Sequence, residues 1–342
     1  MKKYLVLGLV FLLIGSLVIG CGGGKAPATS EPSGNAESTK TQESAQTGQA
    51  EKAEKEIVIG LSMSEDTQFL VNVRKAAEKK AKELGVKLIT MSGQSSVEKQ
   101  VNDVESLIAQ KVDAIILNPL DKEGLGNAVD KVKAAGIPLV EVNTYTTNDK
   151  YDVYVGSDEE DAGRIQGEFV KRTMGTKGNL VILYGVMGHS GQIGRYEGLK
   201  QSLLDPCPDW KVLADMTGNW QRDQGLRIME DWLQKFGDSI DLVVSQNDEM
   251  ALGALQAIEA AGKQDKIKVL GIDASPDAIQ AVKEGRLALT VFQDSFGQGQ
   301  KSVEIALGLV KGQKYNKQEM IPFQEVNKEN ADQFIEKLKE WE

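Results

Sequence analysis

An alternation of short apolar runs with longer amphipathic stretches begins at Glu56 and constrains the fold more than any other feature. The apolar runs predict strands at 57–62, 86–91, 113–117, 137–142, 179–184, 211–216, 241–245, 267–272 and 287–292. The amphipathic stretches predict helices at 69–84, 97–110, 125–135, 159–173, 193–204, 222–236, 249–261, 276–284, 297–311 and 330–341. This order favours parallel sheets with helices on both faces. The units are too many for one sheet, so we expect two α/β domains.

The first 55 residues lack this pattern. A positive start at residues 1–3 precedes an apolar run at 4–19, which is shorter than the roughly 20 residues of a membrane-spanning helix. The following sequence, Val18-Ile19-Gly20-Cys21, resembles a bacterial lipobox. We therefore expect residues 1–21 to be a lipoprotein signal peptide with Cys21 lipidated, a plain secretory signal or anchor helix being the alternatives. Residues 22–55 contain no Val, Ile, Leu or aromatic residue, so we expect a disordered tether.

The composition excludes several classes of function. A net charge of −10 argues against nucleic-acid binding, which requires a basic surface. Two cysteines cannot form a disulfide scaffold or a four-thiolate zinc site, and one histidine excludes most His-based metal and triad chemistry. We expect no cofactor, no metal site and no partner for Cys207. A small neutral ligand and a carboxylate-based enzyme both remain open.

Polar and aromatic residues follow the predicted strands. In parallel sheets, ligands bind beyond the carboxyl ends of the strands. The segments at these positions are 62–69, 118–119, 143–144, 185–195, 218–220, 246–248, 273 and 293–294. Their side chains suit sugar hydroxyls, which both donate and accept hydrogen bonds, and their aromatic rings suit the apolar faces of a sugar ring. The sequence therefore favours a polyhydroxy ligand.

Several motifs occur in an informative order along the chain. They are Asn118-Pro119, Gly156-Ser157-Asp158, Gly188-His189-Ser190, the run from Gln246 to Leu255, and Gly271-Ile272-Asp273 with Pro276-Asp277. Through them, residues 56–325 resemble the periplasmic sugar-binding proteins of ribose, galactose and inositol type, the substrate-binding subunits of ABC importers. The resemblance implies the type I fold, with two Rossmann-like lobes joined by a three-segment hinge and the sugar between them. By analogy, the lobes are 56–157 plus 294–322 and 158–293 plus 323–342.

The resemblance also implies which residues contact the ligand. The rings of Phe69 and Trp220 would sandwich the sugar. Polar contacts would come from Thr67, Gln68, Asn143, His189, Gln192, Arg195, Asn247, Asp273 and Gln293. Arg195 has an alternative role as the partner of a carboxylate such as Glu197. We expect Asp248-Glu249 to cap the following helix rather than bind ligand.

Other residues near these positions have simpler interpretations. Glu65 and Asp66 fit a solvated loop, with the mouth of the ligand cleft as the alternative, and Phe292 and Phe296 fit the core. No catalytic residue is predicted.

Departures from the family pattern bear on the substrate. The ribose branch has paired Phe residues where this chain has Phe69-Leu70, and Asp-Arg where it has Asn143-Thr144. The galactose branch has Asp at the position of Gly191, and its calcium loop has no counterpart here. The stretch 188–192 and the pair Asn219-Trp220 look more like inositol- or polyol-binding members. Ribose or another pentose is the alternative.

Three other functions compete with sugar delivery. A repressor of this fold requires an N-terminal DNA-binding motif, where this chain has a signal and a tether. A glycosidase with paired carboxylates stays open, although no phosphate loop or nucleophile–base pair is evident. A receptor subunit for chemotaxis or a sensor kinase also stays open. We expect a monomeric, non-enzymatic lipoprotein on the outer face of the cytoplasmic membrane, touching the membrane only through its anchor. It would bind no nucleic acid and would deliver its sugar to an ABC permease and its ATPase.

Overall fold

The computed structural model describes residues 55–340. Cys21, the predicted signal peptide and residues 22–54 lie outside the described residues. Within the described part of the chain, no helix is long and apolar enough to span a bilayer.

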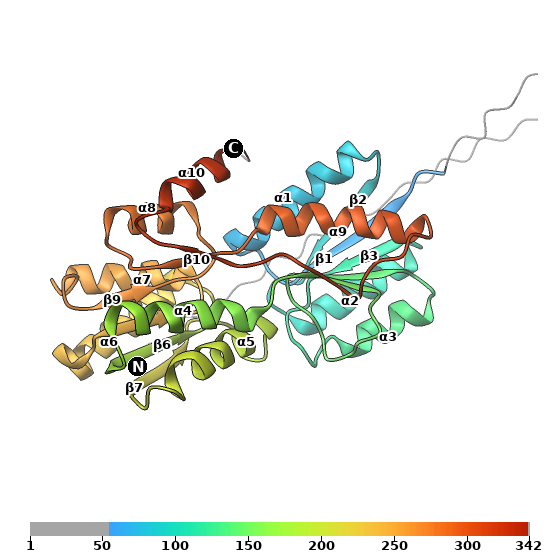
Figure 1. Cartoon of the computed structure of the whole chain (residues 1–342). Helices are drawn as coiled ribbons and strands as arrows, with labels where there is room; N and C mark the ends of the chain where they lie inside the picture. Colours follow the sequence, from blue (N-terminus) through green and yellow to red (C-terminus); the bar gives the residue numbers. More distant parts are fainter. Residues whose placement is uncertain (1–54, 341–342) are drawn as a thin grey trace, which may run out of the picture. The chain divides into compact units, whose positions relative to one another are not determined.

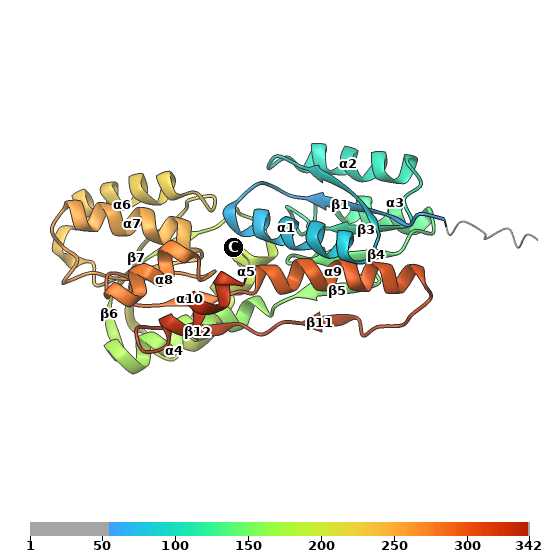
Figure 2. The same ribbon diagram turned by 90° about the horizontal axis from the view of Figure 1, so that it is seen from above.

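Six parallel strands form the first sheet, in the spatial order β11-β5-β4-β3-β1-β2. They are β1 (Val58–Met63), β2 (Lys87–Ser92), β3 (Ala114–Leu117), β4 (Leu139–Val142), β5 (Val153–Gly156) and β11 (Gln318–Met320). Helices α1 (Gln68–Glu83) and α9 (Ser295–Val310) pack together on one face. Helices α2 (Val97–Ala109) and α3 (Gly126–Ala134) cover the other face (Figures 1 and 2). We call this sheet and its four helices the first α/β unit.

Four parallel strands form the second sheet, in the order β7-β6-β8-β9. They are β6 (Lys177–Tyr184), β7 (Asp209–Thr217), β8 (Leu242–Ser245) and β9 (Lys268–Leu270). One face packs on α4 (Glu159–Met174), α5 (Ser190–Leu199) and the π-helical turn Lys200–Leu204. The other face packs on α6 (Arg222–Phe236), α7 (Asp248–Ala260), α8 (Pro276–Glu284) and α10 (Ala331–Lys339). The short 3-10 helix Gly237–Ser239 follows α6.

A short antiparallel pair, β10 (Thr290–Phe292) with β12 (Gln324–Val326), completes this second α/β unit. Isolated bridges join Leu270 to Leu289 and Asp273 to Phe292, which places β10 next to the segment after β9.

The apolar runs form strands because both faces of each sheet are buried. In β3, Ile116 belongs to the core under α1 and α9, whereas Ile115 belongs to the core under α2 and α3. In β6, Val181 belongs to the core under α6 and α7, whereas Leu180 belongs to the core under α4 and α5. Strands buried on both faces need continuous apolar sequence, which is what the runs contain. The expected fold class, parallel sheets flanked by helices, is confirmed.

Three segments connect the two α/β units. Residues 157–158 lead from β5 to α4, residues 293–294 from β10 to α9, and residues 321–323 from β11 to β12. Each crossing therefore lies directly beside an element that lines or supports the site described below.

Some elements differ from the sequence prediction. Strands β5, β11 and β12 were not predicted, because runs of three or four residues are too short to establish a period. The strand expected at 287–292 is reduced to β10, and the helix expected from residue 193 begins at Ser190.

Candidate functional site

A cavity of about 1100 Å³ lies at the carboxyl ends of the parallel strands and is lined by residues of both α/β units. The predicted ligand contacts that line it are Thr67, Gln68, Phe69, Asn143, His189, Arg195, Trp220, Asn247, Asp273 and Gln293. Gln192 is buried but is not part of the lining, and its backbone carbonyl accepts a hydrogen bond from Gln246 Nε2 at 2.9 Å. The tertiary structure thus brings together residues that are up to 226 positions apart in the chain, from Thr67 to Gln293.

Three of these residues have a backbone conformation that is rare for side chains other than glycine. The φ angles are +65° at Asn143, +64° at Trp220 and +120° at Asp273. Such angles cost free energy and persist only where surrounding contacts hold them. The amides of Asn143 and Asp273 each donate to a neighbouring segment at 2.8 Å, to the carbonyls of Val155 and Val291. The strained positions therefore belong to a preformed wall.

Trp220 is fixed by close packing within the second α/β unit. Its side chain meets Gly185, where a Cβ atom would lie 1.9 Å from the indole. The His189 ring meets the indole edge-on at a centroid distance of 5.1 Å, and the Arg195 guanidinium carbon lies 5.6 Å from the indole centroid. Asn247 Nδ2 donates to the Trp220 carbonyl at 3.1 Å. Phe69 lines the same cavity from α1 and is half-buried, so the cavity has an aromatic ring from each unit.

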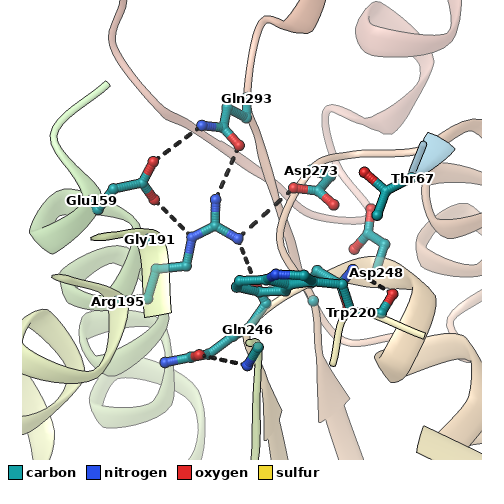
Figure 3. A network of polar contacts seen from close by, with 12 residues as sticks. Thr67, Glu159, Gly191, Arg195, Trp220, Gln246, Asp248, Asp273 and Gln293 are labelled. Carbon is teal, nitrogen blue, oxygen red and sulfur yellow. Dashed lines mark hydrogen bonds and ion pairs between the residues drawn. The ribbon is translucent and has the colours of Figure 1, made fainter. Parts of the chain in front are cut away.

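Arg195 is buried in a closed ring of polar contacts (Figure 3). Its Nε donates to Glu159 Oε2 at 2.7 Å and its Nη2 donates to Gln293 Oε1 at 3.0 Å. Gln293 Nε2 donates to Glu159 Oε1 at 3.3 Å, which closes the ring. The carboxylate that pairs with Arg195 is therefore Glu159 and not Glu197, whose Oε1 accepts from Gln201. Glu197 cannot easily pair with Arg195, because residues two apart on a helix point away from each other.

Asp273 lines the cavity without a direct hydrogen-bond partner for its carboxyl group among the described residues. Its side chain is 13% exposed, and its Oδ1 lies 3.9 Å from Arg195 Nη1. Burial raises the pKa of Asp273 well above its ordinary value, and the positive charge of Arg195 opposes that rise. No hydrogen-bond donor among residues 55–340 reaches its carboxylate oxygens. The carboxyl oxygens of Asp273 therefore have free hydrogen-bonding capacity, suited to ligand hydroxyl groups, which both donate and accept.

His189 is neutral and presents a defined donor. Burial, with a smaller effect from Arg195, lowers the pKa of His189 to about 3. Its Nδ1 accepts a hydrogen bond from the Gly191 amide at 3.1 Å, so the ring proton resides on Nε2. An imidazole N–H at the cavity wall can donate to a hydroxyl oxygen.

Asp248 does not cap the helix that follows it. The cap of α7 is Asn247, whose Oδ1 accepts from the Met250 amide at 3.0 Å. Asp248 is fully buried and accepts hydrogen bonds from Thr290 Oγ1 and the Ser275 amide, each at 2.7 Å. Asp248 therefore holds the segment that carries Asp273. Burial raises the pKa of Asp248. Glu249 forms an ion pair with Arg222 at 2.9 Å.

Four other residues that the sequence singled out also line the cavity. Glu65 and Asp66 line the cavity, and Glu65 is buried, which raises its pKa although Ser95 donates to it at 3.1 Å. Phe292 lies in the core as predicted, but it also lines the cavity, as Phe296 does.

Glu159 is the main residue of the site that sequence reasoning missed. It is the first residue of α4, where an acidic side chain ordinarily stabilises the helix N-terminus. A signal for its role exists in the spacing of glycines, at Gly163 and Gly167 on α4 and at Gly194 and Gly198 on α5. Glycines four apart on two successive helices indicate close helix packing, which brings the start of α4 against α5.

The described residues offer no metal centre. Among residues 55–340, no group of three or more His, Cys, Asp or Glu residues could hold a metal ion. Cys207 is a buried free thiol in the core beneath α4 and α5.

Comparison with known proteins gives consistent matches over most of the chain. The profile of the periplasmic binding protein domain matches residues 58–314. A xylitol-binding protein of Mycolicibacterium smegmatis is 36% identical over 278 residues, covering 81% of this chain and 79% of that protein. The ribose import binding protein of Bacillus subtilis is 36% identical over 264 residues, covering 77% and 85%.

Solved structures show the same similarity. The crystal structure of an ABC transporter solute binding protein from Bacillus halodurans C-125 with bound myo-inositol is 39% identical, with a TM-score of 0.79. The match covers 82% of this chain and 98% of that one.

Proposed function

Since the chain belongs to the periplasmic binding protein family, whose sugar- and polyol-binding members serve ABC importers, we propose that it captures a monosaccharide or cyclic polyol and delivers it to such an importer. The observation that carries this proposal is the preformed cavity wall in which Asp273 and Arg195 lie beside the Trp220 indole. A free carboxylate, a fixed guanidinium and a flat ring are the three groups that recognise vicinal hydroxyls on a ring.

Among neutral ligands, an inositol-like cyclic polyol is our first candidate and ribose or another pentose is the second. The structure with bound myo-inositol is 39% identical, and relatives at 36% identity are named for xylitol and ribose. The Asn143 position supports the polyol assignment. This chain has an amide at position 143 where the ribose branch has a carboxylate, and its Nδ2 donates to Gln298 Oε1 at 3.2 Å.

The N-terminal sequence and the family support a proposal for the cellular arrangement. The family acts outside the cytoplasm, and we propose that Cys21 anchors this chain by lipid to the outer face of the cytoplasmic membrane, with residues 22–55 as a tether. We propose a monomer that binds without chemical conversion and docks on a permease coupled to an ATPase. Its lobes would be residues 56–157 with 294–322 and residues 158–293 with 323–342. They would close on the ligand about the three crossing segments.

A receptor role is the second candidate. A closed, ligand-bound form could equally be read by a chemoreceptor or a sensor kinase, because closure changes the surface formed by the two lobes together.

A ligand screen tests the proposal. The chain starting after Cys21 should gain thermal stability with myo-inositol, xylitol or D-ribose, because a ligand selective for the folded state stabilises it by RT ln(1 + [L]/Kd). Calorimetric titration would then give the Kd. If no pentose, hexose, inositol or alditol shifts the melting temperature, the proposal is wrong.

A further inference from the structure

Glu159 lies behind the cavity wall rather than on its surface. Its side chain is 3% exposed, and it is not among the residues that line the cavity, whereas Arg195, Asp273 and Gln293 are. Figure 3 shows its carboxylate directed at the Arg195 guanidinium from the side opposite Asp273. A buried carboxylate in this position acts on the ligand only through its neighbours.

Close packing of α4 against α5 places Glu159 there. A Cβ atom at Gly163 would lie 2.0 Å from the Arg195 carbonyl, and one at Gly198 would lie 1.9 Å from the Glu160 carbonyl. A Cβ atom at Gly194 would lie 2.6 Å from Glu159 Cβ. These glycines let the two helix backbones touch, so the first residue of α4 meets the middle of α5.

The hydrogen bonds of Arg195 divide its N–H groups between protein and cavity. The guanidinium has five N–H groups. One is taken by Glu159, one by Gln293 Oε1 and one by the Gln246 carbonyl. Two N–H groups remain, one on each Nη atom, and Nη1 lies 3.9 Å from Asp273 Oδ1. Glu159 thus binds the rear of Arg195 and leaves its front for the ligand.

The charges of this group determine what the cavity tolerates. Arg195 is positive, while Glu159 and Asp273 are carboxylates at 2.7 Å and 3.9 Å from it. Because Glu159 forms the direct ion pair with Arg195, Asp273 lies beyond hydrogen-bond distance of the guanidinium. Its oxygen lone pairs remain available to ligand hydroxyl groups. A ligand carboxylate or phosphate entering the cavity would face Asp273 and a guanidinium whose charge is already compensated.

We propose that Glu159 is the selectivity residue of the cavity: by neutralising Arg195 from behind, it keeps Asp273 free for hydroxyl groups and excludes anionic sugars. This inference rests on the proposed function and assigns it a substrate class, neutral polyhydroxy compounds as opposed to uronates. Without the Glu159 charge, Arg195 and Asp273 draw together into a direct pair. Hydroxyl recognition then weakens, and the penalty for an anionic ligand decreases.

The test compares Glu159→Gln with wild type and with Glu160→Gln. Glu160 is the exposed next residue of the same helix turn, so its variant removes one carboxylate without touching the ring. Myo-inositol, xylitol and D-ribose serve as neutral probes, and D-glucuronate and D-galacturonate as anionic probes, each titrated calorimetrically. We expect E159Q to weaken the neutral probe about 10-fold or more and to raise the ratio of anionic to neutral affinity by at least about 10-fold. E160Q should change neither.

Two further variants keep the test decisive if E159Q is unstable. Glu159→Asp retains the charge and should keep the exclusion of uronates even where neutral affinity falls. The double variant E159Q/R195Q also removes the guanidinium that would attract an anionic ligand. It should reject uronates again, because Asp273 is then the one acidic group left of the three.

The outcomes separate this inference from the proposed function. If wild type binds a neutral probe but E159Q leaves the anionic-to-neutral ratio unchanged, the role of Glu159 is wrong and the proposed function stands. The role of Glu159 is equally wrong if E159Q/R195Q binds uronates as E159Q does. If wild type binds no pentose, hexose, inositol or alditol of the ligand screen, the proposed function itself is wrong, and with it this inference.

Discussion

Thr290 Oγ1 donates a hydrogen bond to Asp248 Oδ1 at 2.7 Å, with both side chains fully buried. The Ala274 amide in turn donates to Thr290 Oγ1 at 3.1 Å, and the Ser275 amide to Asp248 Oδ2 at 2.7 Å. These bonds hold the segment in which Asp273 has a φ of +120°. Asp248 on α7 and Thr290 on β10 thus position Asp273, although neither residue is close to it in the sequence.

Thr290→Val should disturb this segment while preserving the side-chain shape. The lost hydroxyl leaves Asp248 and the Ala274 amide each without one buried partner, which costs about 1–3 kcal/mol of unfolding free energy. Ligand Kd should rise severalfold as the Asp273 segment loosens. Denaturant unfolding and calorimetric titration measure the two effects. Unchanged affinity in a destabilised protein would show that the segment does not depend on this bond.

Asp273→Asn should weaken ligand binding and stabilise the free protein. Binding should lose about 2 kcal/mol or more, because the ligand hydroxyls lose one oxygen of the carboxyl group as a hydrogen-bond partner. Burial raises the pKa of Asp273, so the folded state disfavours its ionised form and loses stability as the pH rises above the ordinary carboxyl value. An uncharged side chain avoids that loss, so the ligand-free melting temperature at pH 7 should increase. A retained Kd would remove Asp273 from the site.

Gly185→Ala should impair binding without removing any contact atom. The added methyl group would overlap the Trp220 indole, at 1.9 Å in the present geometry, and must displace it. We expect Kd to rise about 10-fold or more and ligand-induced tryptophan fluorescence to change. Gly126→Ala is the matched control, because its Cβ would meet only Asn148 at 3.6 Å. Equal affinities of the two variants would contradict the role of Trp220.

Glu141→Gln should gain stability relative to wild type as the pH rises from 5 to 8. Burial raises the pKa of Glu141 to about 7, although Thr146 donates to it from its amide and hydroxyl at 3.0 and 2.9 Å. Between the ordinary carboxyl pKa and about 7, the folded chain retains a proton that the unfolded chain has released, so unfolding free energy falls with rising pH. The difference should be at most about 3 kcal/mol.

Melting temperatures of E141Q and wild type at pH 5 and pH 8 measure this dependence. Glu98→Gln, an exposed carboxylate on α2, is the control. A difference between E141Q and wild type that is the same at both pH values would contradict the buried, protonated Glu141.

Cys21→Ser should move the protein from the membrane fraction to the soluble envelope fraction, because the thiol is the predicted site of lipid attachment. Fractionation followed by immunoblotting measures the distribution. Retention in the membrane at the wild-type level would show that the lipobox interpretation is wrong.

The fold was predictable where the sequence pattern is long. The parallel strands at the centre of each sheet contain apolar residues on both faces, so the run itself identifies a strand between two helical layers. Strand β5 has only four residues, and β11 is a polar edge strand of three, so neither has a period to read. Their places depend on the neighbouring strands with which they pair.

The site was predictable as a set of positions but not as a set of contacts. The rule that ligands bind beyond strand ends identified Asp273, Trp220 and Arg195 as candidates, and all three line the cavity. Arg195 was predicted mainly as a ligand contact, with a carboxylate such as Glu197 as the alternative partner. The carboxylate that it pairs with is Glu159, 36 residues away. Ion pairs depend on distance in space, and only helix packing determines that distance.

The sequence by itself determined the alternating α/β architecture and the kind of side chain at each strand end. These are properties of local composition and periodicity, which short-range physics translates directly into elements. Tertiary structure decided the chemistry of the cavity. The contact of α4 with α5 through glycines pairs Glu159 with Arg195, and the bonds of Asp248 hold Asp273 in a strained backbone. Each depends on groups that are brought together only when distant segments pack, where burial makes a single charge or hydrogen bond decisive.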